Sequence, residues 1–380
     1  MASKVALVRC TTYKKAAVEK AVSLGLELLG GVKKFTTVGE QILLKPNILT
    51  GEAPEKCVGP HPQVFRAVAK EFKEAGAVLS FGDSQGFGNP QANAKRAGFM
   101  EPATEIGVTW ADFTTAREIP FPDGHMVKKF QIAEGVAASD GIINISKLKT
   151  HALTRITGAV KNTFGCIPGA RKMEYHSVLP TAALFSKMLV DLNRMLHPRL
   201  FIMDGIYAME GNGPRNGDPR QMNVLLFSDD PVALDATVCR MINLDPGLVE
   251  TIRHGEGFGL GTATDIEYLG EALDTFYSPD FVVNRSPAKT TTGTSFLSTN
   301  FMRRFSAPRP TIDPEKCTCC GQCVKICPAE PKALSWTEAG KDAPPVYDYA
   351  KCIRCYCCQE MCPFEAIDVK TPWLGKIIRL

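Results

Sequence analysis

The sequence predicts an α/β protein with a mostly parallel sheet flanked by helices, followed by a small C-terminal α+β domain. Two observations predict this organisation. Residues 1–283 alternate between strand-like and helix-like runs, which is typical of parallel strands joined by helices. Ten of the 14 cysteines lie between Cys317 and Cys362, so the C-terminal part differs in composition from the rest.

The elements of residues 1–283 are recognised by periodicity and by the residues at their ends. Short β-branched or aliphatic runs predict strands, and apolar residues spaced three and four apart predict helices. Asp230 and Pro231 are typical of a helix start, and Gly76 is typical of a helix end. The predicted strands are Lys4–Cys10, Gln41–Lys45, Ala77–Gly82, Gly141–Ser146, Leu200–Asp204 and Asn223–Ser228, and the predicted helices are Tyr13–Leu29, Pro62–Ala75, Pro180–Leu196 and Pro231–Ile242.

Composition divides the chain into four segments. Residues 1–283 form the α/β body, which we expect to bind a substrate or cofactor. Residues 284–310 are rich in Ser, Thr, Pro and Arg and contain no acidic residue, which predicts a basic linker or strap. Residues 311–371 contain the cysteine-rich domain, and residues 372–380 form a C-terminal tail.

Composition also excludes several classes of protein. Hydrophobic residues make up 44% and charged residues 22%, so the chain is not disordered as a whole. The net charge of +4, from 44 Lys and Arg against 40 Asp and Glu, is too small to indicate a nucleic-acid partner. No apolar run is long enough for a membrane span, and no signal peptide is found. We therefore expect a cytoplasmic protein, in which dense cysteine indicates metal and not a disulfide scaffold.

The cysteine-rich domain contains one pattern twice. The pattern is Cys-x2-Cys-x2-Cys-x3-Cys-Pro, the spacing by which bacterial ferredoxins hold cubane iron–sulfur clusters. Three thiolates of a run bind one cluster, and the fourth binds the other cluster. The sequence therefore predicts two [4Fe-4S] clusters. The ligands of the first are Cys317, Cys320, Cys323 and Cys362, and the ligands of the second are Cys352, Cys355, Cys358 and Cys327.

Zinc is the alternative, because paired Cys-x2-Cys units also bind zinc. A zinc site needs four ligands, often as two separated pairs, whereas here each run has four cysteines followed by proline. The spacing thus favours iron–sulfur clusters. Cys319 and Cys357 are additional cysteines, which could compete as ligands or remain free thiols beside the clusters.

Residues 311–371 resemble two-cluster ferredoxins, with a longer central insertion at residues 329–351. The resemblance implies one-electron transfer at low potential. We expect the domain to be oxygen-sensitive, because cluster loss removes the bonds that join its two cysteine runs.

Polar motifs follow the predicted strands of the body at residues 44–47, 81–84, 146–151 and 204–214. Ligands of open α/β sheets bind at the carboxyl ends of strands, so we expect these motifs to converge. Together with residues 158–165, they resemble the family named domain of unknown function 362, which often carries a fused two-cluster ferredoxin. The resemblance spans nearly the whole chain and implies an iron–sulfur redox protein, but it implies no catalytic residues.

Basic groups near residues 149–176 could bind an anion such as a carboxylate or phosphate, or could form an ordinary solvated surface. His151 could act as a general acid or be a hydrogen-bonded structural residue, and Cys166 could be a redox thiol or a buried small residue. The carboxylates could act as acid–base groups or cap turns. The candidate catalytic residues are His151, Lys149 and Asp83, and the candidate anion-binding residues are Lys45, Asn47, Lys161, Asn162, Arg171, His176, Asp204, Glu210 and Asn212.

The sequence predicts an iron–sulfur oxidoreductase whose ferredoxin domain exchanges electrons with a body that binds a small anionic substrate or cofactor. Its redox partner would be a protein or a small-molecule electron donor or acceptor. No motif indicates a flavin, because the glycine-rich residues 255–259 lack the spacing of a nucleotide-binding loop. The alternatives are a non-enzymatic electron-transfer or assembly protein that docks onto a larger redox complex, and a redox-sensing binding protein.

Overall fold

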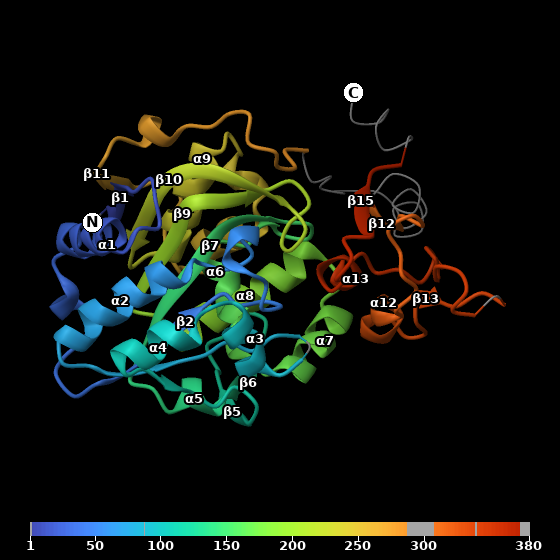
Figure 1. The fold of residues 1–380 in the computed structure, drawn as a ribbon, viewed down its shortest axis with the longest axis horizontal. Coiled ribbons are helices and arrows are strands. Elements are labelled where there is room, and N and C mark those ends of the chain that lie inside the picture. Colours follow the sequence, from blue (N-terminus) through green and yellow to red (C-terminus); the bar gives the residue numbers. More distant parts are fainter. Residues whose placement is uncertain (1, 87, 287–307, 339, 373–380) are drawn as a thin grey trace. The chain divides into compact units, whose positions relative to one another are not determined.

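The computed structural model describes residues 2–86, 88–286, 308–338 and 340–372 (Figure 1). The chain forms two compact units, one of residues 1–172 and 183–283 and the other of residues 173–182 and 284–380. Most of the predicted linker and of the predicted C-terminal tail lies outside the described residues. No helix in the described part of the chain is both long and apolar enough to cross a membrane.

A nine-stranded sheet forms the centre of the first unit (Figure 1). Its strands are β1 (Ser3–Arg9), β2 (Gln41–Pro46), β3 (Val78–Phe81), β4 (Thr109–Trp110), β7 (Gly141–His151), β8 (Arg155–Ile156), β9 (Leu200–Glu210), β10 (Asp218–Ser228) and β11 (Ile266–Gly270). The order is β11-β1-β10-β9-β7-β2-β3-β4, with β8 beside β7. β10 is antiparallel to both of its neighbours and β8 is antiparallel to β7, whereas the other neighbours are parallel. The predicted mostly parallel sheet is confirmed.

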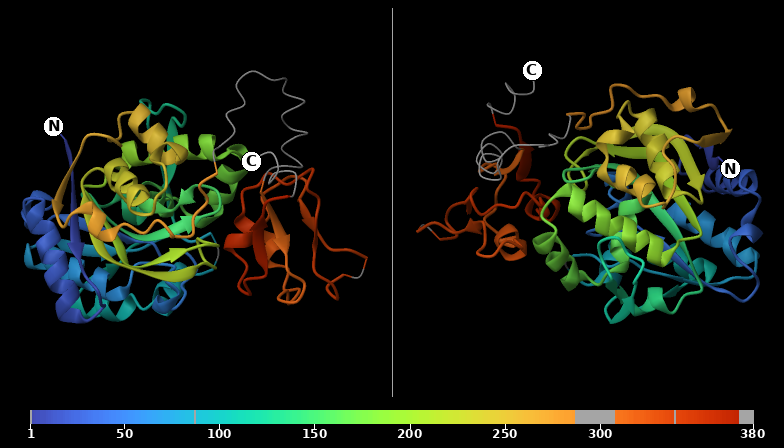
Figure 2. Two further views of the ribbon diagram at one scale, coloured as in Figure 1. Left: turned by 90° about the horizontal axis from the view of Figure 1, so that it is seen from above. Right: turned by 180° about the vertical axis from the view of Figure 1, so that it is seen from behind.

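Helices cover both faces of this sheet (Figures 1 and 2). α1 (Lys15–Leu28), α2 (Pro62–Glu74) and α4 (Met100–Ile106) pack in one apolar core, and α6 (Gly158–Asn162), α9 (Pro231–Met241) and α10 (Glu250–Gly257) pack in the other. Side chains alternate along a strand, so β1 contributes Ala6 to the first core and Val5 to the second. The unit also contains α3 (Pro90–Arg96), α5 (Glu134–Ala137), the start of α7 (Gly169–Val178), α8 (Ala182–Leu196) and the hairpin of β5 (Ala116–Pro120) and β6 (Lys129–Ala133).

All the strands and helices that the sequence predicts in the body are present, but the predicted ends of β7 and β9 are wrong, and β10 begins at Asp218 and not at the predicted Asn223. β7 and β9 each contain 11 residues and continue past Ser146 and Asp204. The motif at 146–151 therefore lies within β7 and not after it. The physical reason is that β7 is buried along its whole length, where its polar side chains bond to partners inside the protein while the strand pairing continues.

The second unit contains short elements that surround its cysteines. β12 (Arg309–Ile312) pairs with β15 (Ile367–Lys370), and β13 (Leu334–Ser335) pairs with β14 (Val346–Tyr347). Two short helices, α12 (Gln322–Ile326) and α13 (Cys357–Glu360), follow the tight cysteine loops. Leu334, Ala366 and Ile367 pack with buried cysteines in a small core. The predicted small α+β domain is confirmed.

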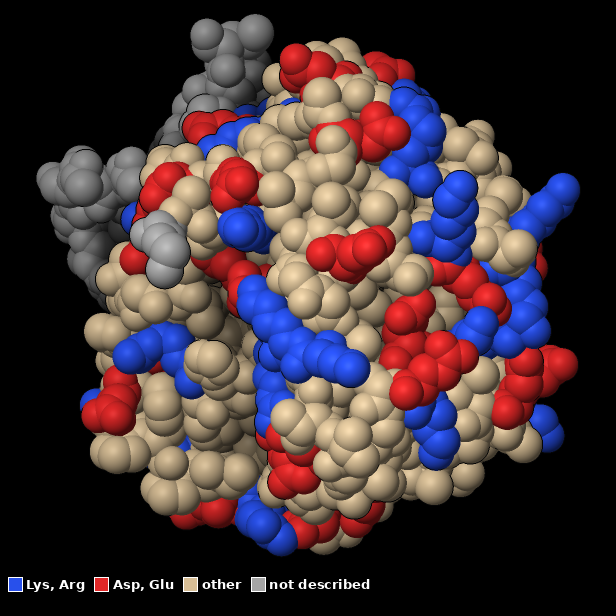
Figure 3. Space-filling view, turned by 90° about the vertical axis from the view of Figure 1, so that its left-hand side faces the viewer, with Lys and Arg blue, Asp and Glu red and all other residues tan. Residues whose placement is uncertain are grey.

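The charged surface of the molecule is mixed in sign. Figure 3 shows acidic and basic side chains interspersed over one face instead of gathered into a patch of a single sign. The chain as a whole is also close to balance, with 44 basic and 40 acidic residues.

Candidate functional site

Two cavities in the second unit are each lined by four cysteines. In both cases three of them come from one run and the fourth comes from the other run. Four thiolates are the donor set of a [4Fe-4S] cluster, so the residues present fit two such clusters. The first cavity is lined by Cys317, Cys320, Cys323 and Cys362, and the second is lined by Cys327, Cys352, Cys355 and Cys358.

The two cysteine loops have matching backbone turns. Cys319 and Arg354 follow the first cysteine of their runs by two residues, and both have a positive φ, of 55° and 63°. Gly321 and Tyr356 follow two residues later, with φ of 73° and 63°. These left-handed residues turn each loop tightly, which brings its cysteines around one cavity.

The additional cysteines lie outside the described linings of both cavities. Cys357 is buried at the start of α13, whereas Cys319 is partly exposed. Their positions favour free thiols beside the clusters, and the ligand register stays a prediction.

Hydrogen bonds reach the sulfur atoms of predicted ligands in both cavities. The Tyr347 hydroxyl donates to Cys358 Sγ at 3.3 Å, and the backbone N–H of Ala366 donates to Cys362 Sγ at 3.4 Å. Hydrogen bonds to ligating sulfur influence the reduction potential of an iron–sulfur cluster.

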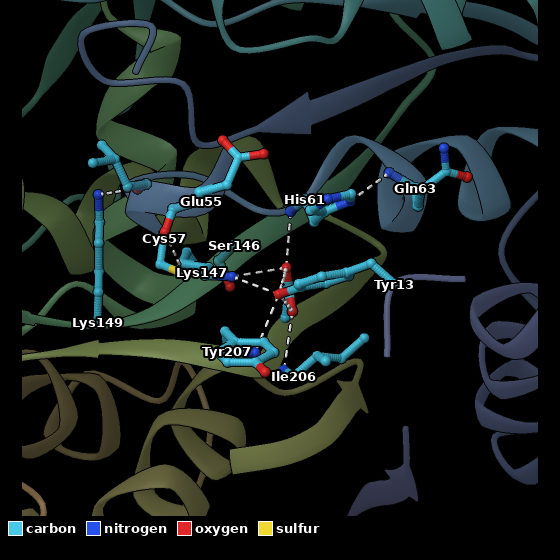
Figure 4. Close-up of polar contacts among 12 residues, drawn as sticks. Tyr13, Glu55, Cys57, His61, Gln63, Ser146, Lys147, Lys149, Ile206 and Tyr207 are labelled. Carbon is cyan, nitrogen blue, oxygen red and sulfur yellow. Dashed lines mark hydrogen bonds and ion pairs between the residues drawn. The ribbon is translucent and has the colours of Figure 1, made fainter. Parts of the chain in front are cut away.

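In the body, a buried ion pair joins two central strands (Figure 4). Lys147 of β7 lies opposite Asp204 of β9, and Lys147 Nζ is 3.0 Å from Asp204 Oδ2. The Tyr13 hydroxyl accepts a hydrogen bond from Lys147 at 3.0 Å and donates to Asp204 at 3.1 Å. The His61 backbone N–H donates to Asp204 at 2.8 Å, and the His61 ring stacks on Tyr13. We call these four residues the tyrosine cluster.

The tyrosine cluster is internally satisfied and electrically balanced. Asp204 also accepts the Ile206 N–H at 3.0 Å. Burial, and then the charge of Asp204, raise the pKa of Tyr13, so its hydroxyl stays protonated. Burial lowers the pKa of His61 to about 4, so its ring is neutral near pH 7. One ammonium and one carboxylate therefore face each other in a site whose main effect is to hold two strands and two loops together.

Asp204 is the one member of the tyrosine cluster that the sequence predicts as a site residue. Lys147 lies inside the polar motif at residues 146–151, and Tyr13 follows the first predicted strand. The spacing gave no sign that these residues meet, because Tyr13 and Asp204 are 191 positions apart.

Lys149 and His151 stabilise loops of the body. Lys149 is 1% exposed, and its ammonium donates to the carbonyls of Val58 at 2.6 Å and Pro214 at 3.1 Å (Figure 4). His151 Nδ1 accepts the Leu153 N–H at 3.0 Å. Through these contacts both side chains of β7 hold backbone groups of neighbouring loops. Their catalytic role stays a prediction.

A second buried cluster joins β2, β3 and α6. Lys45 Nζ is 2.8 Å from Asp83 Oδ1 and donates to Asn162 Oδ1 at 2.8 Å. Asn162 in turn donates to Asn144 Oδ1 at 2.7 Å, and Asp83 Oδ2 accepts the Ile48 N–H at 2.9 Å. This lysine–aspartate cluster brings together three predicted site residues. Asn144 and Lys147 are three positions apart on β7, so this cluster and the tyrosine cluster lie on opposite faces of the sheet.

Three further polar residues lie beside the lysine–aspartate cluster. Lys172 is 8% exposed and donates to the Ser84 carbonyl, and burial lowers the pKa of Lys172 to about 8. Gln85, the next residue after Ser84, is 4% exposed, and neither of its side-chain amide atoms has a hydrogen-bond partner among the described residues. Burial raises the pKa of Cys166 to about 12, which favours a buried structural thiol over a redox thiol.

The remaining candidate residues occupy different surroundings. Glu210 accepts the Val282 N–H at 2.8 Å and pairs with Arg220 at 3.8 Å. On α7, Arg171 is exposed and His176 is buried. Asn47, Lys161 and Asn212 are partly exposed.

The residues that form both body clusters fall largely within a region that matches one family model. The model described as "Domain of unknown function (DUF362)" matches residues 42–240, just over half of the chain. The chain belongs to this family. A second model, described as a 4Fe-4S dicluster domain, matches residues 309–364 of the DUF362 protein. Both resemblances that the motifs indicate are thus confirmed. A two-cluster ferredoxin domain carries single electrons, so the fused domain indicates an electron-transfer function.

The DUF362 protein also has a curated relative and distant structural neighbours. A thylakoid-associated protein of Synechocystis sp. is 35% identical over 270 residues, which cover 70% of this chain and 84% of that protein. The lactate racemase apoprotein of Thermoanaerobacterium thermosaccharolyticum is similar with a TM-score of 0.42 at 10% identity, covering 63% of this chain and 57% of that one. A Thermotoga maritima protein has a TM-score of 0.34 at 10% identity, covering 59% of this chain and 57% of that one. These two weak likenesses carry no argument about function.

Proposed function

We propose that this DUF362 protein is a cytoplasmic iron–sulfur oxidoreductase. In this proposal the ferredoxin domain exchanges electrons with the body, which binds a small anionic substrate or cofactor. The observation that carries the electron-transfer part is the pair of cavities, each lined by four cysteines. A redox partner protein or a small molecule supplies or accepts the electrons. Fusion to the body supports this arrangement, because it raises the effective concentration of the carrier there.

The anionic ligand is supported by the surroundings of Lys172 and Gln85. A buried amide without a partner is costly unless a ligand or water satisfies it. Lys172 bonds the carbonyl directly before Gln85, so its ammonium lies beside the backbone of the residue whose amide is unpaired among the described residues. A carboxylate or another oxoanion could accept from both groups. Lys45 lies near the carboxyl end of β2 and Asp83 follows β3, and the carboxyl ends of strands are also where ligands of open α/β sheets bind.

We predict that anion binding to the body weakens as the pH rises through about 8. The folded-state pKa of Lys172 is lowered to about 8, so above this pH its ammonium loses the charge that attracts the anion. The dissociation constant should then rise by up to about tenfold per pH unit. Calorimetric titration of the full chain with acetate, phosphate or sulfate between pH 6.5 and 9 measures this effect.

Two variants make this test specific. Lys172→Met should remove the pH-dependent binding without changing the iron content. Lys95→Met, at an exposed position near the end of α3, should keep the wild-type profile. An unchanged profile in Lys172→Met, or no binding of any of the three anions, would contradict an anion site at Lys172.

The second candidate is a non-enzymatic electron-transfer or assembly protein whose body docks onto a larger redox complex. It is favoured by the way Lys147 pairs with Asp204 and Lys45 with Asp83, since these buried charges already have partners without a substrate. Anaerobic purification followed by analysis of metals, flavins and small molecules separates the two candidates. A bound small acid supports the oxidoreductase, whereas a stable redox complex without one supports docking.

A further inference from the structure

The Tyr347 side chain forms a hydrogen bond with a cysteine of the second cavity. It lines the cavity of Cys327, Cys352, Cys355 and Cys358, and its hydroxyl donates to Cys358 Sγ at 3.3 Å. We propose that Tyr347 raises the reduction potential of the cluster in this cavity. The inference rests on the ligand sets of the proposed function. It adds a residue outside those sets that influences the reduction potential of one cluster.

The physical reason is the charge that reduction adds. When an external donor passes one electron to a [4Fe-4S] core, the cluster and its thiolates become more negative by one charge. A tyrosine hydroxyl has an ordinary pKa near 10 and keeps its proton at neutral pH. A hydrogen bond to a more negative sulfur is stronger, so Tyr347 stabilises the reduced state more than the oxidised state.

An aromatic and cationic stack holds Tyr347 in place. The Tyr347 ring stacks on Tyr349 with ring centroids 5.4 Å apart. The guanidinium of Arg309 lies 4.3 Å from the centre of the Tyr349 ring, and that of Arg354 lies 5.2 Å from it. Arg354 is 6% exposed, and its Nε and Nη1 atoms have no hydrogen-bond partner in the part of the chain that the structure describes. No carboxylate of the described residues forms an ion pair with Arg354, so its positive charge stabilises the reduced state in the same direction as the hydroxyl.

The other cavity lacks the corresponding side chains among the described residues. Cys319 occupies the loop position that Arg354 occupies in the second run, and the hydrogen bond to Cys362 comes from the backbone of Ala366. Cys320 of this cavity is exposed. A change at Tyr347 should therefore act mainly on the cluster whose Cys358 sulfur accepts its hydrogen bond.

Replacing Tyr347 by phenylalanine tests the proposal. The variant keeps the ring and loses the donor, so the equilibrium constant for one-electron reduction of this cluster should fall by about threefold to tenfold. A tenfold fall corresponds to about 59 mV for one electron. Anaerobic redox titration of the full chain followed by electron paramagnetic resonance measures the potentials. Hyperfine-shifted β-proton resonances of Cys358 and Cys320 in nuclear magnetic resonance spectra assign the change to a cluster.

Tyr349→Phe is the matched control. The Tyr349 hydroxyl donates to the Pro310 carbonyl at 2.9 Å, so this variant removes a hydroxyl from the same stack without removing a bond to sulfur. Both potentials should stay at their wild-type values. The proposal is overturned if Tyr347→Phe leaves the potential unchanged, shifts both clusters equally, loses iron, or matches Tyr349→Phe. Wild-type protein without a [4Fe-4S] signal would overturn the ligand assignment itself, and this inference with it.

Discussion

Replacing Cys355 by alanine is expected to remove one of two clusters and to leave the other in place. Cys355 lines the second cavity, so its loss leaves three thiolates there and the full set of four in the first cavity. Anaerobically prepared wild-type protein should hold about eight iron and eight sulfide ions per chain, and the variant about four of each. Iron and acid-labile sulfide analysis measures the difference, and Cys320→Ala should give the same loss from the first cavity.

The additional cysteines supply the controls for this experiment. Cys357 is buried close to Cys355 in sequence, and Cys319 directly precedes Cys320. Alanine at either position should leave about eight iron ions, because neither residue is in the described lining of a cavity. Zinc in place of iron, or equal iron loss from Cys357→Ala and Cys355→Ala, would show that the ligand sets are wrong.

Asp204→Ala is expected to lower the free energy of unfolding of the body by about 3–5 kcal/mol. Removing one partner of a buried ion pair leaves the other charge uncompensated. Here the Lys147 ammonium would keep only the Tyr13 hydroxyl among its described partners, and the backbone N–H groups of His61 and Ile206 would lose their acceptor. Denaturant unfolding followed by circular dichroism measures the loss.

A matched exposed pair shows whether burial is the cause. Lys34 and Asp229 lie 2.9 Å apart with side chains 44% and 41% exposed. Asp229→Ala should cost less than about 1 kcal/mol, because water screens this pair. The double variant Lys147→Met with Asp204→Leu should recover part of the loss, since it leaves no unpaired charge. Equal losses from Asp204→Ala and Asp229→Ala would contradict a stabilising role of the buried pair.

The sequence was most informative where function depends on local spacing. The cysteines of one run lie within a tight loop, so their spacing alone indicates which thiolates share a cavity. The tyrosine cluster is different, because Lys147 meets Asp204 only when β7 and β9 are parallel neighbours in a particular register. Periodicity indicates that a strand exists, but it does not give strand order or register.

Buried polar residues also limited the prediction of strand ends. Apolar alternation in β7 stops at Ser146, where exposed loop residues are normally expected. Lys147 and Lys149 are nevertheless buried, because Asp204 and two backbone carbonyls receive their ammonium groups. A polar residue with a buried partner looks the same in sequence as a solvated one, so the strand appeared shorter than it is.

The exchange of the fourth cysteine between the two runs has a consequence for biosynthesis. The second run supplies the fourth cysteine of the first cavity, and Cys327 of the first run belongs to the second cavity. A nascent chain that has reached only residue 351 therefore contains neither complete set, although the whole body has already been synthesised. Insertion of iron and sulfide must follow translation of nearly the entire cysteine-rich domain, and a message truncated before the codon for Cys352 would yield a body that carries no complete cluster site.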